Sequence, residues 1–109
     1  MGNSETFVAV AASGNIAVRT TELGQPVRLR IRQEELNRHP AHLAAEIVLL
    51  CRQAADRAAL LRRAALEAAG MSAAALAATG LPTRDEVAAA ELAYDQQFGA
   101  EPQIWVRPN

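Results

Sequence analysis

Residues 27–32 read VRLRIR and alternate strictly between aliphatic and arginine side chains. Successive side chains of a β-strand point to opposite faces of a sheet, so this period of two predicts a strand with one apolar and one basic face. We expect the aliphatic residues, Val27, Leu29 and Ile31, to form the face on which a helix lies. The three arginines are then expected on the face that meets water or a partner.

Two more strands are predicted upstream of this stretch. Residues 7–12, FVAVAA, and residues 16–21, IAVRTT, are rich in aliphatic and β-branched side chains and are separated by a Ser-Gly-Asn turn signal. Leu23-Gly24 stands where a two-residue hairpin turn belongs. Leucine is unfavourable at positive φ, so a longer turn that reaches Pro26 is an alternative. Three strands with short links predict an antiparallel meander.

From position 41 the apolar period changes to three or four, which predicts a helix over residues 41–69 with Pro40 at its first position. At about 1.5 Å per residue this helix would be about 43 Å long, more than a three-stranded sheet covers. A helix that is too long and too apolar for its own sheet indicates a partner surface, most simply a second copy. The expected dimer or partner interface comprises Leu43, Ile47, Val48, Leu50, Leu60, Leu61, Leu66, Tyr94 and Phe98.

The rest of the chain predicts two further helices and a tail. Residues 72–79 suggest a short helix, and Thr83 and Glu86 form a capping box that begins a helix over residues 83–98. The tail, residues 99–109, contains an Ile-Trp-Val segment that could dock on the body. The expected fold class is therefore α+β: a three-stranded antiparallel β-meander over residues 7–33, a long helix and a shorter C-terminal helix, in a single domain over residues 1–109.

Composition narrows the class of protein. The chain has 109 residues, a formal net charge of −1 and no lysine, whereas a dedicated nucleic-acid binder usually carries a clear positive excess. A single cysteine excludes an intramolecular disulfide and a cysteine-based metal site. The sequence shows neither a secretory signal nor an apolar run of transmembrane length, so a cytoplasmic location is expected.

No residue pattern typical of an enzyme is present. His39 and His42 flank Pro40, but no third ligand has helpful spacing, so we interpret them as surface or cap residues. Cys51 lies in the predicted long helix beside Leu50, where a small buried apolar side chain is the expected role. We therefore expect no catalytic residues, no cofactor, no metal and no small-molecule substrate.

The arginines are the one candidate binding surface. If Leu23-Gly24 centres the hairpin, Arg19 falls opposite Arg28, and like charges in that position cost up to about 1 kcal/mol. Two interpretations stay open. Either the row contacts an anion, DNA or an acidic partner, or nearby carboxylates neutralise it. The candidate contact residues are Arg19, Arg28, Arg30 and Arg32, and the candidate neutralising residues are Glu22, Glu34 and Glu35.

Two segments resemble a known group of proteins. LAAEIVLLCRQAADRA, residues 43–58, and GLPTRDEVAAAELAYDQQF, residues 80–98, are similar to the actinobacterial EspD/EspH proteins associated with type VII (ESX) secretion. The order of three strands and a long helix also resembles the YbaB/EbfC nucleoid-associated family, without that family's leading helix. The likeness spans roughly residues 7–98, and the third strand of this chain is far richer in arginine.

The resemblance implies a cytoplasmic, non-enzymatic interaction module that assists type VII secretion, for example by stabilising or chaperoning its substrates. A homodimer is expected, with an ESX substrate or accessory protein as partner. The alternative is a YbaB/EbfC-like nucleoid-associated protein whose arginines contact DNA phosphates. The usual export signals of ESX substrates are not met: Trp105 is followed by Val106-Arg107, and Tyr94 has Phe98 four residues later.

Overall fold

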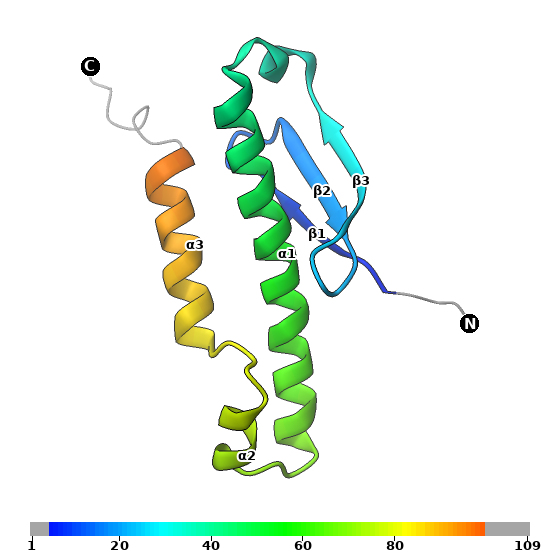
Figure 1. Cartoon of the computed structure of the whole chain (residues 1–109), viewed down its shortest axis with the longest axis vertical. Helices are drawn as coiled ribbons and strands as arrows, with labels where there is room; N and C mark the ends of the chain where they lie inside the picture. Colours follow the sequence, from blue (N-terminus) through cyan, green and yellow to red (C-terminus); the bar gives the residue numbers. More distant parts are fainter. Residues whose placement is uncertain (1–4, 100–109) are drawn as a thin grey trace.

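Figure 1 shows the computed structural model of the chain, which describes residues 5–99. Three strands come first and form one antiparallel sheet in the order β1-β2-β3. The elements are β1 (Phe7–Val10), β2 (Ile16–Thr20), β3 (Pro26–Ile31), the 3₁₀ helix η1 (Gln33–Asn37), α1 (Pro40–Ala68), α2 (Ala73–Ala78) and α3 (Arg84–Phe98). The predicted α+β class is confirmed, and element ends differ from the expected ones by a residue or two. The tail beyond Gly99 lies outside the described residues.

The β2–β3 connection is the longer of the two turns considered from the sequence. Thr21 N–H donates to the Gln25 carbonyl at 2.9 Å, and Gly24 N–H donates to the Thr21 carbonyl at 3.0 Å. Gly24 has φ +86°, so the left-handed position falls on glycine and spares Leu23 that conformation. Arg19 lies directly opposite Arg28, the pairing expected from a two-residue turn. Here the longer turn is combined with a shift in register between Arg19 and Thr20, and the two together produce that pairing.

Helix α1 begins and ends with local signals that the sequence carries. Pro40 occupies its first turn, and His39 caps it by accepting a hydrogen bond from Ala41 N–H at Nδ1, at 3.1 Å. At the other end Gly70 takes φ +95°, which stops the helix and lets its N–H reach the Glu67 carbonyl at 3.0 Å. The predicted length of this helix is confirmed.

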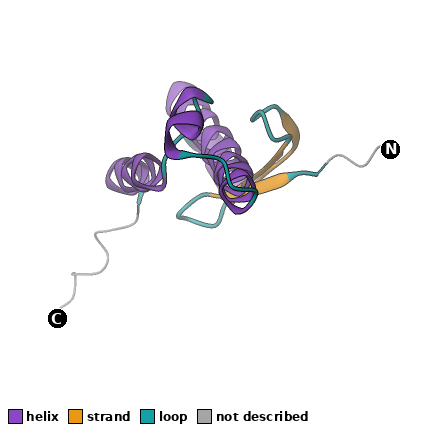
Figure 2. Ribbon diagram, turned by 90° about the horizontal axis from the view of Figure 1, so that it is seen from below, coloured by secondary structure: helices purple, strands orange, loops and turns teal. Residues whose placement is uncertain are grey.

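The core lies between α1 and the inner face of the sheet, with α3 closing one side. Leu50 and Ala54 of α1 are fully buried against Ile16 and Val18 of β2. Tyr94 of α3 is 6% exposed and completes the same cluster. Figure 1 shows α3 running antiparallel beside α1, and Figure 2 shows all the helices on one side of the sheet. In the part of the chain that the structure describes, nothing covers the outer face.

The third strand is not where the sequence placed it relative to α1. The helix packs on β1 and β2, and β3 extends beyond it, as Figure 1 shows. Val27 and Leu29 are 58% and 43% exposed. Leu29 lies opposite the buried Val18 and belongs to the inner face as predicted, whereas Val27 lies at an irregularity in the β2–β3 pairing and has no partner residue on β2. Instead of covering all three strands, α1 packs closely on β1 and β2, because the buried side chains Ala9 and Ala54 are small enough for the helix to approach β1.

Candidate functional site

Four arginines project from the outer face of the sheet. Arg19 lies opposite Arg28, Arg30 lies opposite Ala17, and Arg32 follows directly after β3. All four arginines are exposed. Arg19 donates to the Thr6 hydroxyl at 3.4 Å, which is a weak contact that leaves its charge uncompensated. We call Arg19, Arg28, Arg30 and Arg32 the arginine face.

Of the three carboxylates that could have neutralised this face, two pair with other arginines and one forms no ion pair with a described residue. Glu22 pairs with Arg62 of α1, and Glu35 pairs with Arg38 at 2.6 Å. Glu34 forms no ion pair with any described residue. Within residues 5–99, each of the six ion pairs uses an arginine outside the arginine face. The row of like charges that the sequence predicted is therefore present and unpaired.

Apolar side chains share the outer face with the arginines. Val8, 41% exposed, lies opposite Arg19, and Val10, 50% exposed, lies one pleat further along β1. A hollow of about 170 Å³ lies among Val8, Ala17, Arg19, Arg28 and neighbours. The surface is thus basic along β3 and aliphatic along β1.

The inner side of β3 borders a second depression. A groove of about 400 Å³ runs between the β2–β3 turn and α1, with Leu23 and Pro26 on one wall and Val48 and Cys51 on the other. Leu23 is 75% exposed and Val48 is 54% exposed. Both faces of β3 are consequently accessible, one basic and one apolar.

The predicted interface residues fall into two groups. Leu50 and Tyr94 are 0% and 6% exposed and belong to the core of this chain, so their assignment to a partner interface is corrected. Their surface is already covered by the sheet and by α1. Val48 and Leu61 are 54% and 62% exposed and are free to meet a partner. The remaining five, Leu43, Ile47, Leu60, Leu66 and Phe98, are half-buried.

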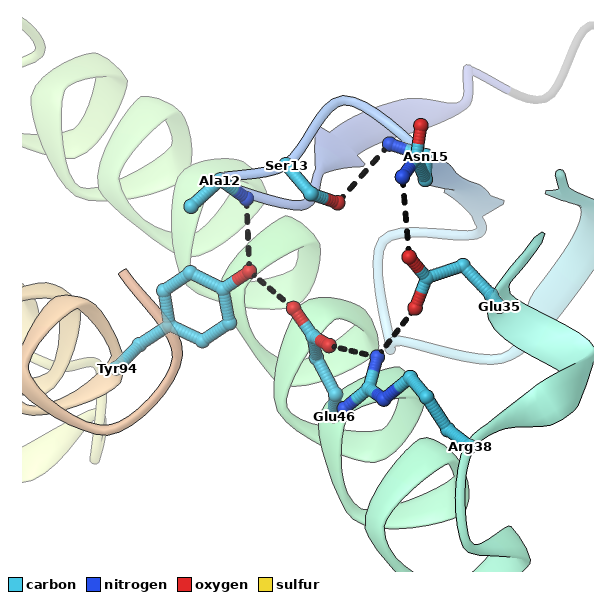
Figure 3. A network of polar contacts seen from close by, with 7 residues as sticks. All are labelled: Ala12, Ser13, Asn15, Glu35, Arg38, Glu46 and Tyr94. Carbon is cyan, nitrogen blue, oxygen red and sulfur yellow. Dashed lines mark hydrogen bonds and ion pairs between the residues drawn. The ribbon is translucent and has the colours of Figure 1, made fainter. Parts of the chain in front are cut away.

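A buried polar network lies at the end of the sheet where β3 ends and η1 begins. Figure 3 shows its central residue, Glu46 of α1, which is 4% exposed. Glu46 accepts a hydrogen bond from the Tyr94 hydroxyl at 2.6 Å and pairs with Arg38 at 2.7 Å. The Tyr94 oxygen in turn accepts from Ala12 N–H at 3.0 Å. One carboxylate thereby ties α1 to α3, to the segment after η1 and, through Tyr94, to the β1–β2 turn.

The second carboxylate of the network extends it to β2 and β3. Glu35 accepts from Arg38 at 2.6 Å and from Asn15 Nδ2 at 3.0 Å. The Asn15 carbonyl accepts from Arg32 N–H at 2.8 Å, which fixes the last residue of the arginine face. Hydrogen bonds from Arg38 and Asn15 lower the pKa of Glu35. Burial, together with the neighbouring Glu46 carboxylate, raises the pKa of Tyr94.

Sequence reasoning missed this network. The available signal was Glu46 itself, a carboxylate placed three residues after Leu43 and four before Leu50, on the apolar stripe of the helix. A charged residue on a buried stripe requires a partner, because an unpaired buried charge is costly. The partner could not be named, since Arg38 and Tyr94 are brought to Glu46 by the tertiary fold.

The lowered pKa of Glu35 predicts a specific loss of stability in acid. A carboxyl whose folded pKa lies below its ordinary 4.5 stabilises the fold above that pH, and the contribution is lost as pH falls through the folded pKa. We expect Glu35→Gln to be less stable at pH 7 and to lose less stability than the native protein on acidification below pH 4.5. Urea unfolding across this range measures both quantities. The control is Glu34→Gln, a change at the adjacent residue, which forms no ion pair within residues 5–99. If the stability of Glu35→Gln and that of the native protein fell equally steeply with pH, the prediction would be contradicted.

The remaining chemistry-bearing side chains have structural roles. His39 caps α1, as interpreted from the sequence, and its ring lies 5.7 Å from that of His42. Cys51 is half-buried in the wall of the groove, and burial raises the pKa of its thiol, which disfavours the nucleophilic thiolate. Among residues 5–99, no three His, Cys, Asp or Glu side chains are grouped to hold a metal ion.

Searches for similar proteins and for membrane segments add no assignment. No family model, no curated protein and no solved structure matches the chain. None of the described helices is both long and apolar enough to cross a bilayer. The arginine face and the two accessible sides of β3 are therefore the features on which a functional proposal can rest.

Proposed function

We propose that this protein is a non-enzymatic interaction module that binds an acidic protein partner through β3 and the arginine face. The observation that carries the proposal is the exposure of β3 on both sides. Its arginines have no carboxylate partner among the described residues, while its aliphatic residues Val27 and Leu29 are exposed. An exposed basic and apolar strand has uncompensated charge and unburied surface, and a complementary partner satisfies both.

The setting we propose is type VII secretion, where the module would stabilise or chaperone a substrate in the cytoplasm and act as a homodimer. The setting rests on the resemblance of residues 43–58 and 80–98 to EspD/EspH proteins. The homodimer is supported by exposed apolar residues on the helices, away from the arginine face. Leu61 is 62% exposed and Leu92 is 57% exposed. Sedimentation at high micromolar concentration tests it, and a stable monomer would remove the dimer from the proposal.

Affinity capture from the native host tests the partner. We expect the native chain to retain a component or substrate of type VII secretion and the triple variant Arg28→Ser, Arg30→Ser, Arg32→Ser to lose it. The matched control replaces Arg52, Arg62 and Arg84 on the helices by Ser, which changes the net charge equally. Mass spectrometry of the eluates measures the difference. Equal capture by the two triple variants would show that the partner binds elsewhere.

A second candidate function is DNA binding of the YbaB/EbfC kind, and one observation favours it. The net charge of −1 conceals an uneven distribution: residues 5–32 contain four arginines and two glutamates, residues 33–39 contain one arginine and two glutamates, and residues 40–98 contain five arginines and seven acidic residues. The sheet side is therefore basic although the chain as a whole is not. Four unpaired arginines on one face could contact phosphates.

An electrophoretic mobility assay at low salt decides this candidate. If DNA is the ligand, the native chain shifts duplex DNA, and the affinity falls with a log–log salt slope of roughly one per phosphate contact. The triple variant at Arg28, Arg30 and Arg32 should lose most of that slope, whereas the helix-side triple variant should keep it. Absence of a shift by the native protein at low salt would eliminate DNA binding.

A further inference from the structure

The outer edge of β3 carries backbone groups without a partner. Arg32 N–H donates to the Asn15 carbonyl, so the backbone groups of Arg32 point toward β2. Residues of an antiparallel strand alternate in the direction of their backbone groups, so those of Arg28 and Arg30 also point toward β2. Those of Leu29 and Ile31 then point away from the sheet. Within residues 5–99 the structure gives these outward groups no hydrogen bond.

The opposite edge of the sheet is partly occupied. Ala11 N–H donates to the Ile16 carbonyl at 2.8 Å, so by the same alternation the backbone groups of Val8 point outward from β1. The Val8 carbonyl accepts a hydrogen bond at 2.7 Å from Arg57 of α1. Figure 1 places α1 over β1 and leaves β3 clear of it. Addition of a strand is therefore possible at β3 and hindered at β1.

The side chains of β3 specify which strand would fit. A strand added to this edge places its residues beside those of β3, on alternating faces. On the outer face they would meet Arg28 and Arg30, where Asp or Glu forms opposite-charge pairs. On the inner face they would meet Leu29, which is 43% exposed, so that aliphatic side chains there bury apolar surface. The complementary sequence is therefore one of alternating acidic and aliphatic residues.

A second copy of β3 does not meet this requirement. Any antiparallel register that keeps the apolar residues on one face sets arginines beside arginines. Like charges directly opposite one another are destabilising on a sheet. The arginines thus disfavour edge-to-edge pairing of two copies, which is a common hazard of an exposed strand.

We propose that the edge of β3 binds an extended polypeptide segment of alternating acidic and aliphatic residues as a fourth strand of the sheet. This rests on the proposed function as an interaction module and deepens it. It names the form of the partner and the backbone atoms that hold it, the outward N–H and C=O groups of Leu29 and Ile31. Main-chain hydrogen bonds supply binding, and the two faces of β3 supply selectivity.

The probe is a synthetic peptide of about seven residues in which Glu and Val alternate, long enough for one strand. Three control peptides accompany it: one with the same composition in two blocks, one with Lys in place of Glu, and one N-methylated at alternate amides. Amide hydrogen exchange, measured by NMR on the full native chain, reports directly on the backbone N–H groups at the β3 edge. The Leu29 and Ile31 amides should gain protection on binding, while the Arg28 and Arg30 amides are protected already.

We expect the N-methylated peptide to bind at least about tenfold more weakly, because it loses two or more backbone hydrogen bonds. The block and Lys peptides should also bind at least about tenfold more weakly. Leu29→Pro removes an outward N–H without breaking the β2–β3 ladder. This variant should bind the alternating Glu–Val peptide more weakly, by a similar factor. If that variant does not fold, the N-methylated peptide tests the same hydrogen bonds on the native protein.

The outcomes separate this inference from the proposed function. Equal binding of the alternating and N-methylated peptides, or no binding at about 1 mM peptide, overturns strand addition. If a partner is nevertheless captured from the host and lost from the triple variant at Arg28, Arg30 and Arg32, the interaction module stands and binds in another form. If no partner is captured either, both proposals fail.

Discussion

Leu50→Ala is expected to lower the free energy of unfolding by about 3 kcal/mol, within the range measured for buried leucines. Leu50 is fully buried and joins α1 to β2 and to Tyr94 of α3, so truncation leaves a cavity where three elements meet. Ala54, which lies one turn further along, is already the smallest apolar side chain and cannot fill the space. Urea denaturation of the native and variant proteins measures the loss.

The matched control is Leu61→Ala, the same change in the same helix at a side chain that is 62% exposed. In dilute protein it should cost less than about 0.5 kcal/mol. A loss at Leu61 that grows with protein concentration would indicate cover by a second copy, as the proposed homodimer requires. Equal effects of the two substitutions in dilute protein would contradict the position of the core.

Glu46→Ala is expected to cost about 3 kcal/mol, because it removes a buried carboxylate that accepts from Tyr94 and pairs with Arg38. The Tyr94 hydroxyl is left buried without its acceptor. Arg38 keeps Glu35 and is partly exposed, which holds the loss below that of a fully buried ion pair. Thermal or urea unfolding at neutral pH measures the effect.

Two further variants apportion the loss. Glu46→Gln keeps an oxygen for the Tyr94 hydroxyl and removes the charge that Arg38 meets, so about half the loss is expected. Glu34→Ala removes an exposed glutamate and should change stability by less than about 0.5 kcal/mol. If Glu46→Ala resembled Glu34→Ala, the network would not stabilise the fold.

The sequence allowed prediction of the three strands and of helices α1, α2 and α3, but not of the 3₁₀ helix η1. The period of two in residues 27–32, the period of three to four after position 41 and the Thr83–Glu86 capping box each depend on neighbours in the chain. The pairing of Arg19 with Arg28 was expected from a two-residue turn, but it results from the longer turn together with a register shift between Arg19 and Thr20. The strands and helices were confirmed because secondary structure is decided over short separations.

Features that depend on tertiary packing could not be predicted. Periodicity assigned Val27 and Leu29 to the inner face but could not show that α1 would lie over β1 and β2 instead. Periodicity also could not show which apolar residues of α1 face the core of this chain and which face a partner. Leu50 was therefore expected at the partner interface, although it lies in the core. The fate of the arginine face depended on Glu22 and Glu35, which pair with arginines distant from that face.

The hydrogen bond from Arg57 to the Val8 carbonyl has a consequence for stoichiometry. A sheet with two accessible edges can polymerise, because each added strand leaves a site on the other side. If a segment adds to β3 as proposed, we expect this sheet to bind only one, because Arg57 occupies the Val8 carbonyl at the β1 edge. Loss of the Arg57 cap would make the sheet divalent and convert a discrete one-to-one complex into a species able to grow.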